Sequence, residues 1–241
     1  MKKLMLLSLM AAAGVAHADV IYSNGPVVGG NGLSVLASPA TTLGFGMNTS
    51  ANLAVADDFT VAAGTVWNVQ SLDFFGYQTG STGFTFTGAT WSIISGDVNT
   101  GTVVASGSGA VTNGGLQGYR VTETTLTNTQ RGIYKANADV TDFTLDAGTY
   151  WLRWSLTGSL VSGPWQPPTS DAREGNAAQA STSSSGTFIE LIDTGSTLTV
   201  ELPFGVNGTI AAAVPEPSSY LLMLAGGLAV AGLARRRRQA K

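Results

Sequence analysis

The chain has 241 residues, of which 44% are hydrophobic and only 11% are charged, and its formal net charge is −3. It contains no cysteine and a single histidine, His17. This composition excludes disulfide bonds and the zinc sites that are built from cysteine and histidine.

The N-terminal segment has the layout of a secretory signal peptide. Two lysines precede an apolar run over 4–15, and Ala16 and Ala18 put small residues at the two positions that a signal peptidase inspects. We therefore predict a signal peptide over 1–18 that is cleaved before Asp19, and export of the rest of the chain.

The body that remains is acidic and has lost His17. Without histidine or cysteine it cannot host a Ser-His-Asp or Cys-His catalytic arrangement. Between residues 19 and 214, five lysines and arginines stand against ten aspartates and four glutamates, which gives a charge of −9. We predict no nucleic-acid partner, and a neutral or cation-bridged polysaccharide rather than an acidic one.

Alternating apolar residues in the body predict short β-strands separated by glycine-rich and polar turns. In the clearest case Tyr150, Leu152, Trp154 and Leu156 occupy alternate positions, which is typical of a half-buried strand. The predicted strands cover 20–23, 52–61, 66–77, 84–94, 102–105, 119–126, 143–145, 150–156, 188–192 and 198–204.

The third of these strands changes its apolar face part-way along. Trp67 and Val69 share one face, but Leu72 falls on the opposite parity. One extra residue moves every later side chain to the other face, so we predict a β-bulge near Gln70 and Ser71.

The fold class follows from the strand count and the absence of sustained helical periodicity between the two termini. We predict an all-β domain over 19–210, an antiparallel β-sandwich or jelly roll. The polar stretch 169–186 is long for a connection, and we interpret it as either a functional loop or a mobile one.

Aromatic side chains give the body one candidate binding site. Trp151, Trp165 and Tyr134 could form a flat platform that stacks on sugar rings, and Gln166 could supply a hydrogen bond beside it. Trp165 is the strongest candidate, because prolines and glycine place it on a loop. Core packing is the alternative for each of these aromatic residues.

The acidic residues suggest two further sites, each with an ordinary alternative. Glu190 and Glu201 are candidates for the paired carboxylates of a glycoside hydrolase, although nothing in the sequence fixes their separation. Oxygen ligands for calcium could come from one of two groups, Asp57 with Asp58 or Asp139 with Asp142 and Asp146. Neither group has the spacing of a calcium loop, so solvated turn residues are the alternative and we predict no metal and no cofactor.

The C-terminal tail, 211–241, carries three features in a fixed order. Pro215, Glu216 and Pro217 are followed by an uncharged segment over 218–234, which we predict to be a hydrophobic helix of marginal spanning length. The stop cluster then follows: Arg235, Arg236, Arg237 and Arg238. The positive-inside rule keeps these arginines on the cytoplasmic side of the inner membrane and leaves the body outside.

In these residues the tail resembles the PEP-CTERM sorting signal of Gram-negative bacteria. The resemblance implies recognition by an exosortase-type protease, transient anchoring in the inner membrane, and release to the cell surface or an exopolysaccharide matrix. It implies no activity for the body. We predict a non-catalytic structural or polysaccharide-associated protein, and the alternative is a carbohydrate-active enzyme that uses paired carboxylates.

Overall fold

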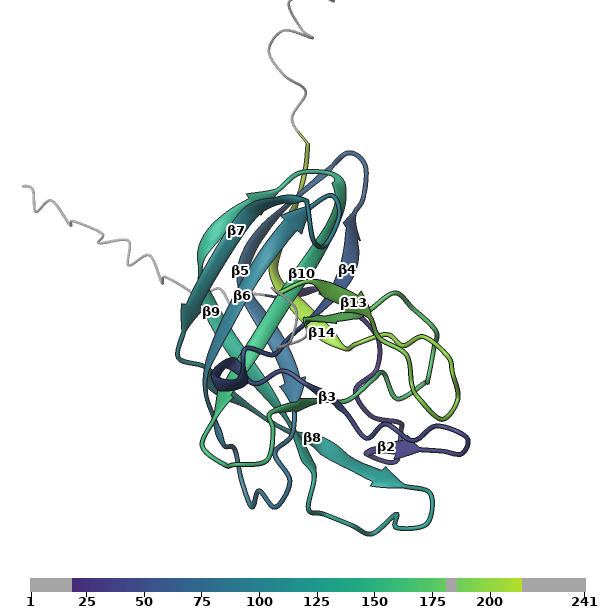
Figure 1. Ribbon diagram of the computed structural model, residues 1–241. Coiled ribbons are helices and arrows are strands. Elements are labelled where there is room, and N and C mark those ends of the chain that lie inside the picture. Colours follow the sequence, from purple (N-terminus) through teal and green to yellow (C-terminus); the bar gives the residue numbers. More distant parts are fainter. Residues whose placement is uncertain (1–18, 181–185, 214–241) are drawn as a thin grey trace, which may run out of the picture.

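The computed structural model describes residues 19–180 and 186–213, which form a β-sandwich of two facing sheets (Figure 1). Within these ranges there is no α-helix, and the one helical turn is the 3₁₀-helix η1 (Thr49–Ala51). The prediction of an all-β sandwich is confirmed. The predicted signal peptide and the sorting tail from residue 214 onward lie outside the described residues.

Each large sheet has six strands. In spatial order the first contains β1 (Asp19–Ser23), β14 (Phe204–Ala212), β5 (Thr65–Gly76), β9 (Gly132–Leu145), β8 (Thr112–Thr122) and β2 (Leu33–Leu36). The second contains β13 (Phe188–Glu190), β12 (Ala178–Ala180), β4 (Ala54–Val61), β10 (Gly148–Gly158), β6 (Phe86–Ser95) and β7 (Thr102–Gly109). A small third sheet pairs β11 (Trp165–Gln166) with β3 (Phe45–Gly46).

The core lies between the two large sheets and is rich in aromatic rings. The alternate residues of β10 that the sequence predicts to be buried, from Tyr150 to Leu156, all face it. Trp154 is 1% exposed and stacks on Phe74 of the facing sheet, with ring centroids 5.8 Å apart. Because such rings bury large areas and pack in preferred geometries, they fix the distance between the sheets without disulfides.

The bulge predicted in β5 is present. The register between β5 and β14 shifts so that one residue of β5, Gln70, has no partner, and the pairing with β9 is irregular at the same place. As a result Trp67, Val69, Leu72 and Phe74 are all buried in the same core.

The final predicted strand, 198–204, is wrong. Leu198 is 46% exposed, and this segment makes only one isolated bridge before β14 begins at Phe204. Pro203 has no N–H to donate to a strand ladder, which explains why regular pairing starts after it. β14 then continues to Ala212, into residues that the sequence assigns to the tail.

Two further features differ from the sequence-based expectation. β2 pairs with β8 in parallel, so the first sheet is not wholly antiparallel. The polar stretch 169–186 contains β12, a three-residue strand that pairs with β4.

The strands of both sheets lie within the described residues, and so does the large core cluster. We therefore expect residues 19–213 to fold without the two ends of the chain. In the described ranges no helix is long and apolar enough to cross a membrane.

Candidate functional site

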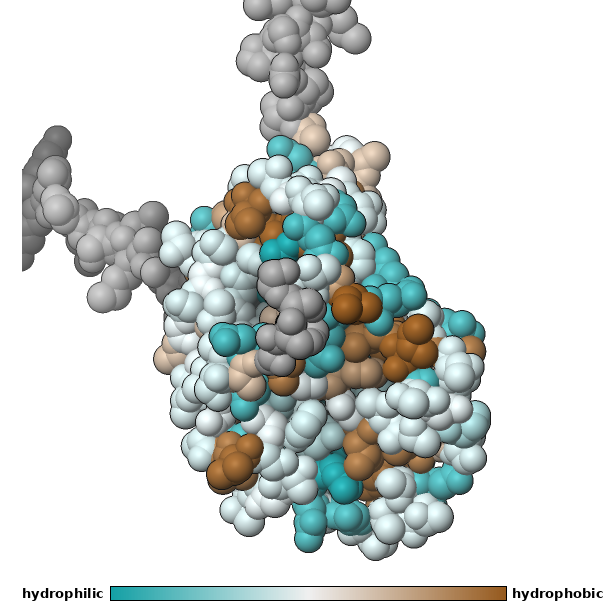
Figure 2. Space-filling view, in the orientation of Figure 1, coloured by the Kyte–Doolittle hydropathy of each residue, from teal (hydrophilic) through white to brown (hydrophobic). Residues whose placement is uncertain are grey.

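A groove of about 450 Å³ opens on the outer face of the second sheet. We call it the hydroxyl groove, and it is lined by Ala54, Thr90, Trp91, Ser92, Ser106, Gly107, Ser108, Arg153, Trp154, Ser155 and Phe188. Figure 2 views the molecule from this side. Brown hydrophobic side chains lie near β13, β2 and one end of β7 in this view, and much of the remaining visible surface over β6 and β7 is pale.

Strand alternation creates the polar lining of the groove. Successive side chains of a strand point to opposite faces, and Trp91 of β6 and Trp154 of β10 point into the core. The residues beside them therefore point outward, and the strand register aligns them in two rows across β10, β6 and β7. One row is Arg153, Ser92 and Ser106, and the other is Ser155, Thr90 and Ser108.

Arg153 is the cationic group of this lining. Its terminal nitrogen Nη2 donates to the carbonyl oxygen of Val98, and its guanidinium carbon lies 5.0 Å from the centre of the Phe188 ring. Its Nε atom is shielded from solvent and has no hydrogen-bond partner among the described residues. Burial lowers the pKa of Arg153, and Asp97 acts in the opposite direction.

An apolar wall closes one side of the groove. Phe188 packs with Val98 and the alanines of β12, and Trp151 packs against the same cluster. The side chain of Asn99 holds Phe188 in place through two hydrogen bonds, because its Nδ2 donates to the Phe188 carbonyl at 3.0 Å and its Oδ1 accepts from the Phe188 N–H at 2.7 Å. Trp151, one of the predicted sugar-binding residues, supports this wall but is not among the residues that line the groove.

The other predicted sugar-binding residues lie elsewhere. Trp165 is half-buried in β11, packs on the small cluster of Phe75, Tyr77 and Ile133, and donates from Nε1 to Ser162 at 3.2 Å. Gln166 is 0% exposed. Its amide nitrogen donates to two proline carbonyls and its oxygen accepts from Trp154, so it has no group left for a ligand. The structure does not bring Trp165, Gln166 and Trp151 into one site.

The two carboxylates predicted as a catalytic pair, Glu190 and Glu201, lie in different environments. Glu190 is exposed on the edge strand β13, whereas Glu201 is half-buried and has a raised pKa, chiefly because of burial. Asp58 also raises the pKa of Glu201, and Glu201 in turn raises the pKa of Asp57 of β4.

Asp57 is the centre of a buried polar network. It is 0% exposed, and its carboxylate accepts hydrogen bonds from the N–H groups of Asp58 at 2.8 Å and Leu202 at 2.7 Å and from Nδ2 of Asn24 at 3.1 Å. Tyr22 donates to Asn24 at 2.8 Å. Burial raises the pKa of Asp57 to about 8 and that of Tyr22 to about 12. The network ties β1 and β4 to the segment before β14.

The calcium candidates do not form a cluster. Asp139, Asp142 and Asp146 are exposed, and Asp142 accepts a hydrogen bond from Gln70. In the part of the chain that the structure describes, no group of three or more acidic or histidine side chains is arranged to hold a metal ion.

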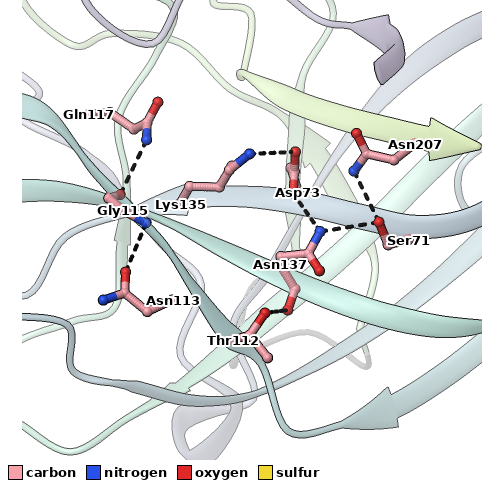
Figure 3. A network of polar contacts seen from close by, with 9 residues as sticks. All are labelled: Ser71, Asp73, Thr112, Asn113, Gly115, Gln117, Lys135, Asn137 and Asn207. Carbon is pink, nitrogen blue, oxygen red and sulfur yellow. Dashed lines mark hydrogen bonds and ion pairs between the residues drawn. The ribbon is translucent and has the colours of Figure 1, made fainter. Parts of the chain in front are cut away.

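A second polar cluster lies on the outer face of the first sheet (Figure 3). Asn137 donates to Asp73 at 2.7 Å and to Ser71 at 3.1 Å, Lys135 pairs with Asp73 at 3.3 Å, and Asn207 donates to Ser71 at 3.2 Å. These bonds cross β9, β5 and β14 and satisfy the buried carboxylate of Asp73. We interpret the cluster as a structural tie between strands.

Sequence reasoning missed most of the hydroxyl groove, although a signal for it was present. Three short stretches have the same form, with two polar residues separated by one tryptophan or glycine: 90–92, 106–108 and 153–155. Alternation predicts that each polar pair shares a face. That the three pairs lie side by side depends on the register, which the sequence does not reveal.

The tail matches a known sorting motif. Residues 213–238 match the family model of the PEP-CTERM protein-sorting motif. The chain carries a PEP-CTERM sorting motif. The match includes the Pro-Glu-Pro residues 215–217, the apolar segment and the arginine cluster 235–238, so the resemblance stated from the sequence is confirmed.

The PEP-CTERM motif has consequences for the route of the protein. It marks an exported chain that is sorted by an exosortase and is anchored transiently in the membrane before it reaches the surface. No curated protein matches the chain at a significant level. The motif therefore indicates how the protein is sorted, and the role of the body has to be inferred from its structure.

Proposed function

We propose that this PEP-CTERM protein is a non-catalytic component of the cell surface or extracellular matrix that binds polysaccharide in the hydroxyl groove. One observation carries the proposal: two aligned rows of polar side chains cross three strands beside an apolar wall. Sorting toward the surface, where polysaccharide is abundant, supports it.

The chemistry of the groove suits a sugar chain. Sugars present hydroxyl groups that donate and accept hydrogen bonds, and serine and threonine hydroxyls do both. The apolar faces of sugar rings can pack against Phe188, the aromatic residue of the wall that lines the groove. The volume of about 450 Å³ lies within the range of roughly 300–1,000 Å³ that ligand sites occupy.

The same lining argues against glycoside hydrolysis in the groove. That reaction uses two carboxyl groups on either side of the scissile bond, and the lining contains no aspartate or glutamate. Glu201 raises the pKa of Asp57, but Asp57 is fully buried and cannot touch a substrate. A carbohydrate-active enzyme is therefore the weaker proposal.

The proposed route begins at the predicted signal peptide. Cleavage after Ala18 would release Asp19 as the new N-terminus, and the apolar segment over 218–234 would then hold the chain in the inner membrane. An exosortase-type protease would act near the Pro-Glu-Pro motif and release the body to the surface or an exopolysaccharide matrix.

Affinity electrophoresis of residues 19–213 in gels that contain single polysaccharides tests the proposal. At least one polymer should retard the protein, and Ser106→Trp, which fills the groove from an exposed position, should abolish the retardation. Thr144→Trp is the matched control, because Thr144 is exposed on β9 of the other sheet. Absence of retardation by every polymer would contradict the proposal, and release of reducing ends would favour the enzyme.

A further inference from the structure

The hydroxyl groove differs in charge from the rest of the protein. The body between residues 19 and 214 carries a charge of −9, yet Arg153 is the one charged residue among those that line the groove. It is also the one charged residue in β6, β7 and β10, the three strands that form the floor. The local charge of the groove is therefore positive.

Asp97 is the carboxylate that acts on Arg153, and it raises the pKa of Arg153 without forming an ion pair with it. Asp97, in the turn between β6 and β7, uses its Oδ1 atom to accept from the N–H groups of Asn99 and Thr100 and from the Thr100 hydroxyl. No ion pair joins it to Arg153, and the ion pairs of the described residues are Lys135 with Asp73 and Arg173 with Asp171. Arg153 thus lacks a carboxylate partner within these ranges.

The geometry of Arg153 also favours a planar anion. A guanidinium group presents its N–H donors in a rigid fork that matches a carboxylate in a two-point contact. Here the ring of Phe188 and the carbonyl of Val98 fix the plane of the fork. Because Nε is shielded from solvent, an anion in the groove would meet the N–H donors of the two Nη atoms. Such a preorganised donor loses little side-chain freedom when an anion binds.

We propose that the hydroxyl groove selects polysaccharides that contain uronic acids, with the sugar carboxylate on Arg153 and the sugar hydroxyls on the serine and threonine rows. This inference rests on the proposed function of the groove and narrows its ligand. It also replaces the expectation of a neutral polysaccharide, which was drawn from the net charge alone. Charges more than about 8 Å away are largely screened at physiological salt. Arg153, rather than the net charge of the body, therefore determines whether an acidic sugar is preferred in the groove.

The test compares two polymers that differ only in the acid group. Residues 19–213 are titrated with oligogalacturonate and with the same oligomer after its carboxyl groups have been reduced to alcohols. Wild type should bind the acid form about tenfold more tightly, the scale expected for a charge-assisted contact. Arg153→Gln should remove this preference, and Arg153→Lys should retain only part of it because lysine lacks the fork.

Two further variants separate ligand contact from folding. Ser92→Asp places a carboxylate opposite Arg153 in the strand register and should abolish the preference while Arg153 remains in place. Arg173→Gln is the control, since Arg173 pairs with Asp171 away from the groove. Melting temperatures of all variants are measured in parallel.

The outcomes distinguish this inference from the proposed function. Equal binding of both oligomers that is unchanged by Arg153→Gln would overturn the acid-sugar inference and leave the polysaccharide-binding proposal in place. Absence of binding by either oligomer, together with no retardation in the polysaccharide gels, would overturn both. Preference for the acid form that is lost in Arg153→Gln and Ser92→Asp would establish the inference.

Discussion

Replacing Asp57 with asparagine should change how the stability of the domain depends on pH. Burial raises the pKa of Asp57 from 3.8 to about 8, and Glu201 adds to the effect. The hydrogen bonds from the N–H groups of Leu202 and Asp58 act in the opposite direction but are weaker. Because the folded pKa lies above the unfolded value, the carboxyl contributes stability at low pH, and this contribution is lost as the pH rises through about 8.

The magnitude follows from the size of the shift. Each pKa unit corresponds to about 1.4 kcal/mol, so the wild type should lose up to about 4 kcal/mol of unfolding free energy from this group between pH 5 and pH 8.5. Asparagine does not ionise and shows no such loss. Its oxygen can still accept from Asn24 and Leu202, but its amide would face the N–H of Asp58, at a pH-independent cost of roughly 1–3 kcal/mol.

Urea unfolding of residues 19–213 at pH 5 and pH 8.5 measures the difference directly. Between pH 5 and pH 8.5, the difference in unfolding free energy between Asp57→Asn and wild type should shift by up to about 4 kcal/mol in favour of the variant. Asp97→Asn is the control, because hydrogen bonds lower the pKa of Asp97 and its titration falls below this range. If wild type and Asp57→Asn lose stability in parallel, Asp57 is ionised throughout, and the reasoning from burial is refuted.

Three further predictions concern other parts of the chain. Asp193→Ala should lower the unfolding free energy by about 2–3 kcal/mol in urea unfolding, because Asp193 accepts from the backbone N–H groups of two loops; an unchanged midpoint would contradict this. Trp165→Ala should destabilise the domain by about 2 kcal/mol through lost packing and leave polysaccharide retardation intact; loss of retardation at full stability would restore Trp165 as a binding residue. Mass spectrometry of the surface fraction should find a chain that begins at Asp19 and lacks 235–238, and an intact tail in mature protein would refute processing.

Local patterns predicted those parts of the fold that depend on one strand. β10 was predictable because its alternation is strict, and the bulge in β5 because the apolar parity changes within one strand. β14 was not predictable, since glycine, asparagine and alanine interrupt its apolar pattern and it is held by partners far along the chain.

In the candidate site, too, some features can be read from one strand and others depend on partners far along the chain. Asp57 occupies an alternate position with Val55, Phe59 and Val61, so its burial could have been inferred from parity. The burial of Gln166 could not, because its partners come from β10 and from Pro203. The rows of the hydroxyl groove depend on the pairing of strands that lie up to about sixty residues apart, which one sequence does not encode locally.

Packing in the core fixes the position of the polar residues on the outer face of the second sheet, because each polar pair flanks a residue that faces the core. Trp91 and Trp154 are buried, and each lies between two outward polar residues of its strand. Gly107 pairs with Trp91 across β6 and β7, and a Cβ atom at this position would meet the indole ring at 2.9 Å. The absence of a side chain lets β7 lie against Trp91 and brings Ser106 and Ser108 into line with β6. Packing against the core fixes the strands β6, β7 and β10 that form the groove floor. The polar rows are therefore held in place before a ligand binds, and this reduces the entropy that is lost on binding.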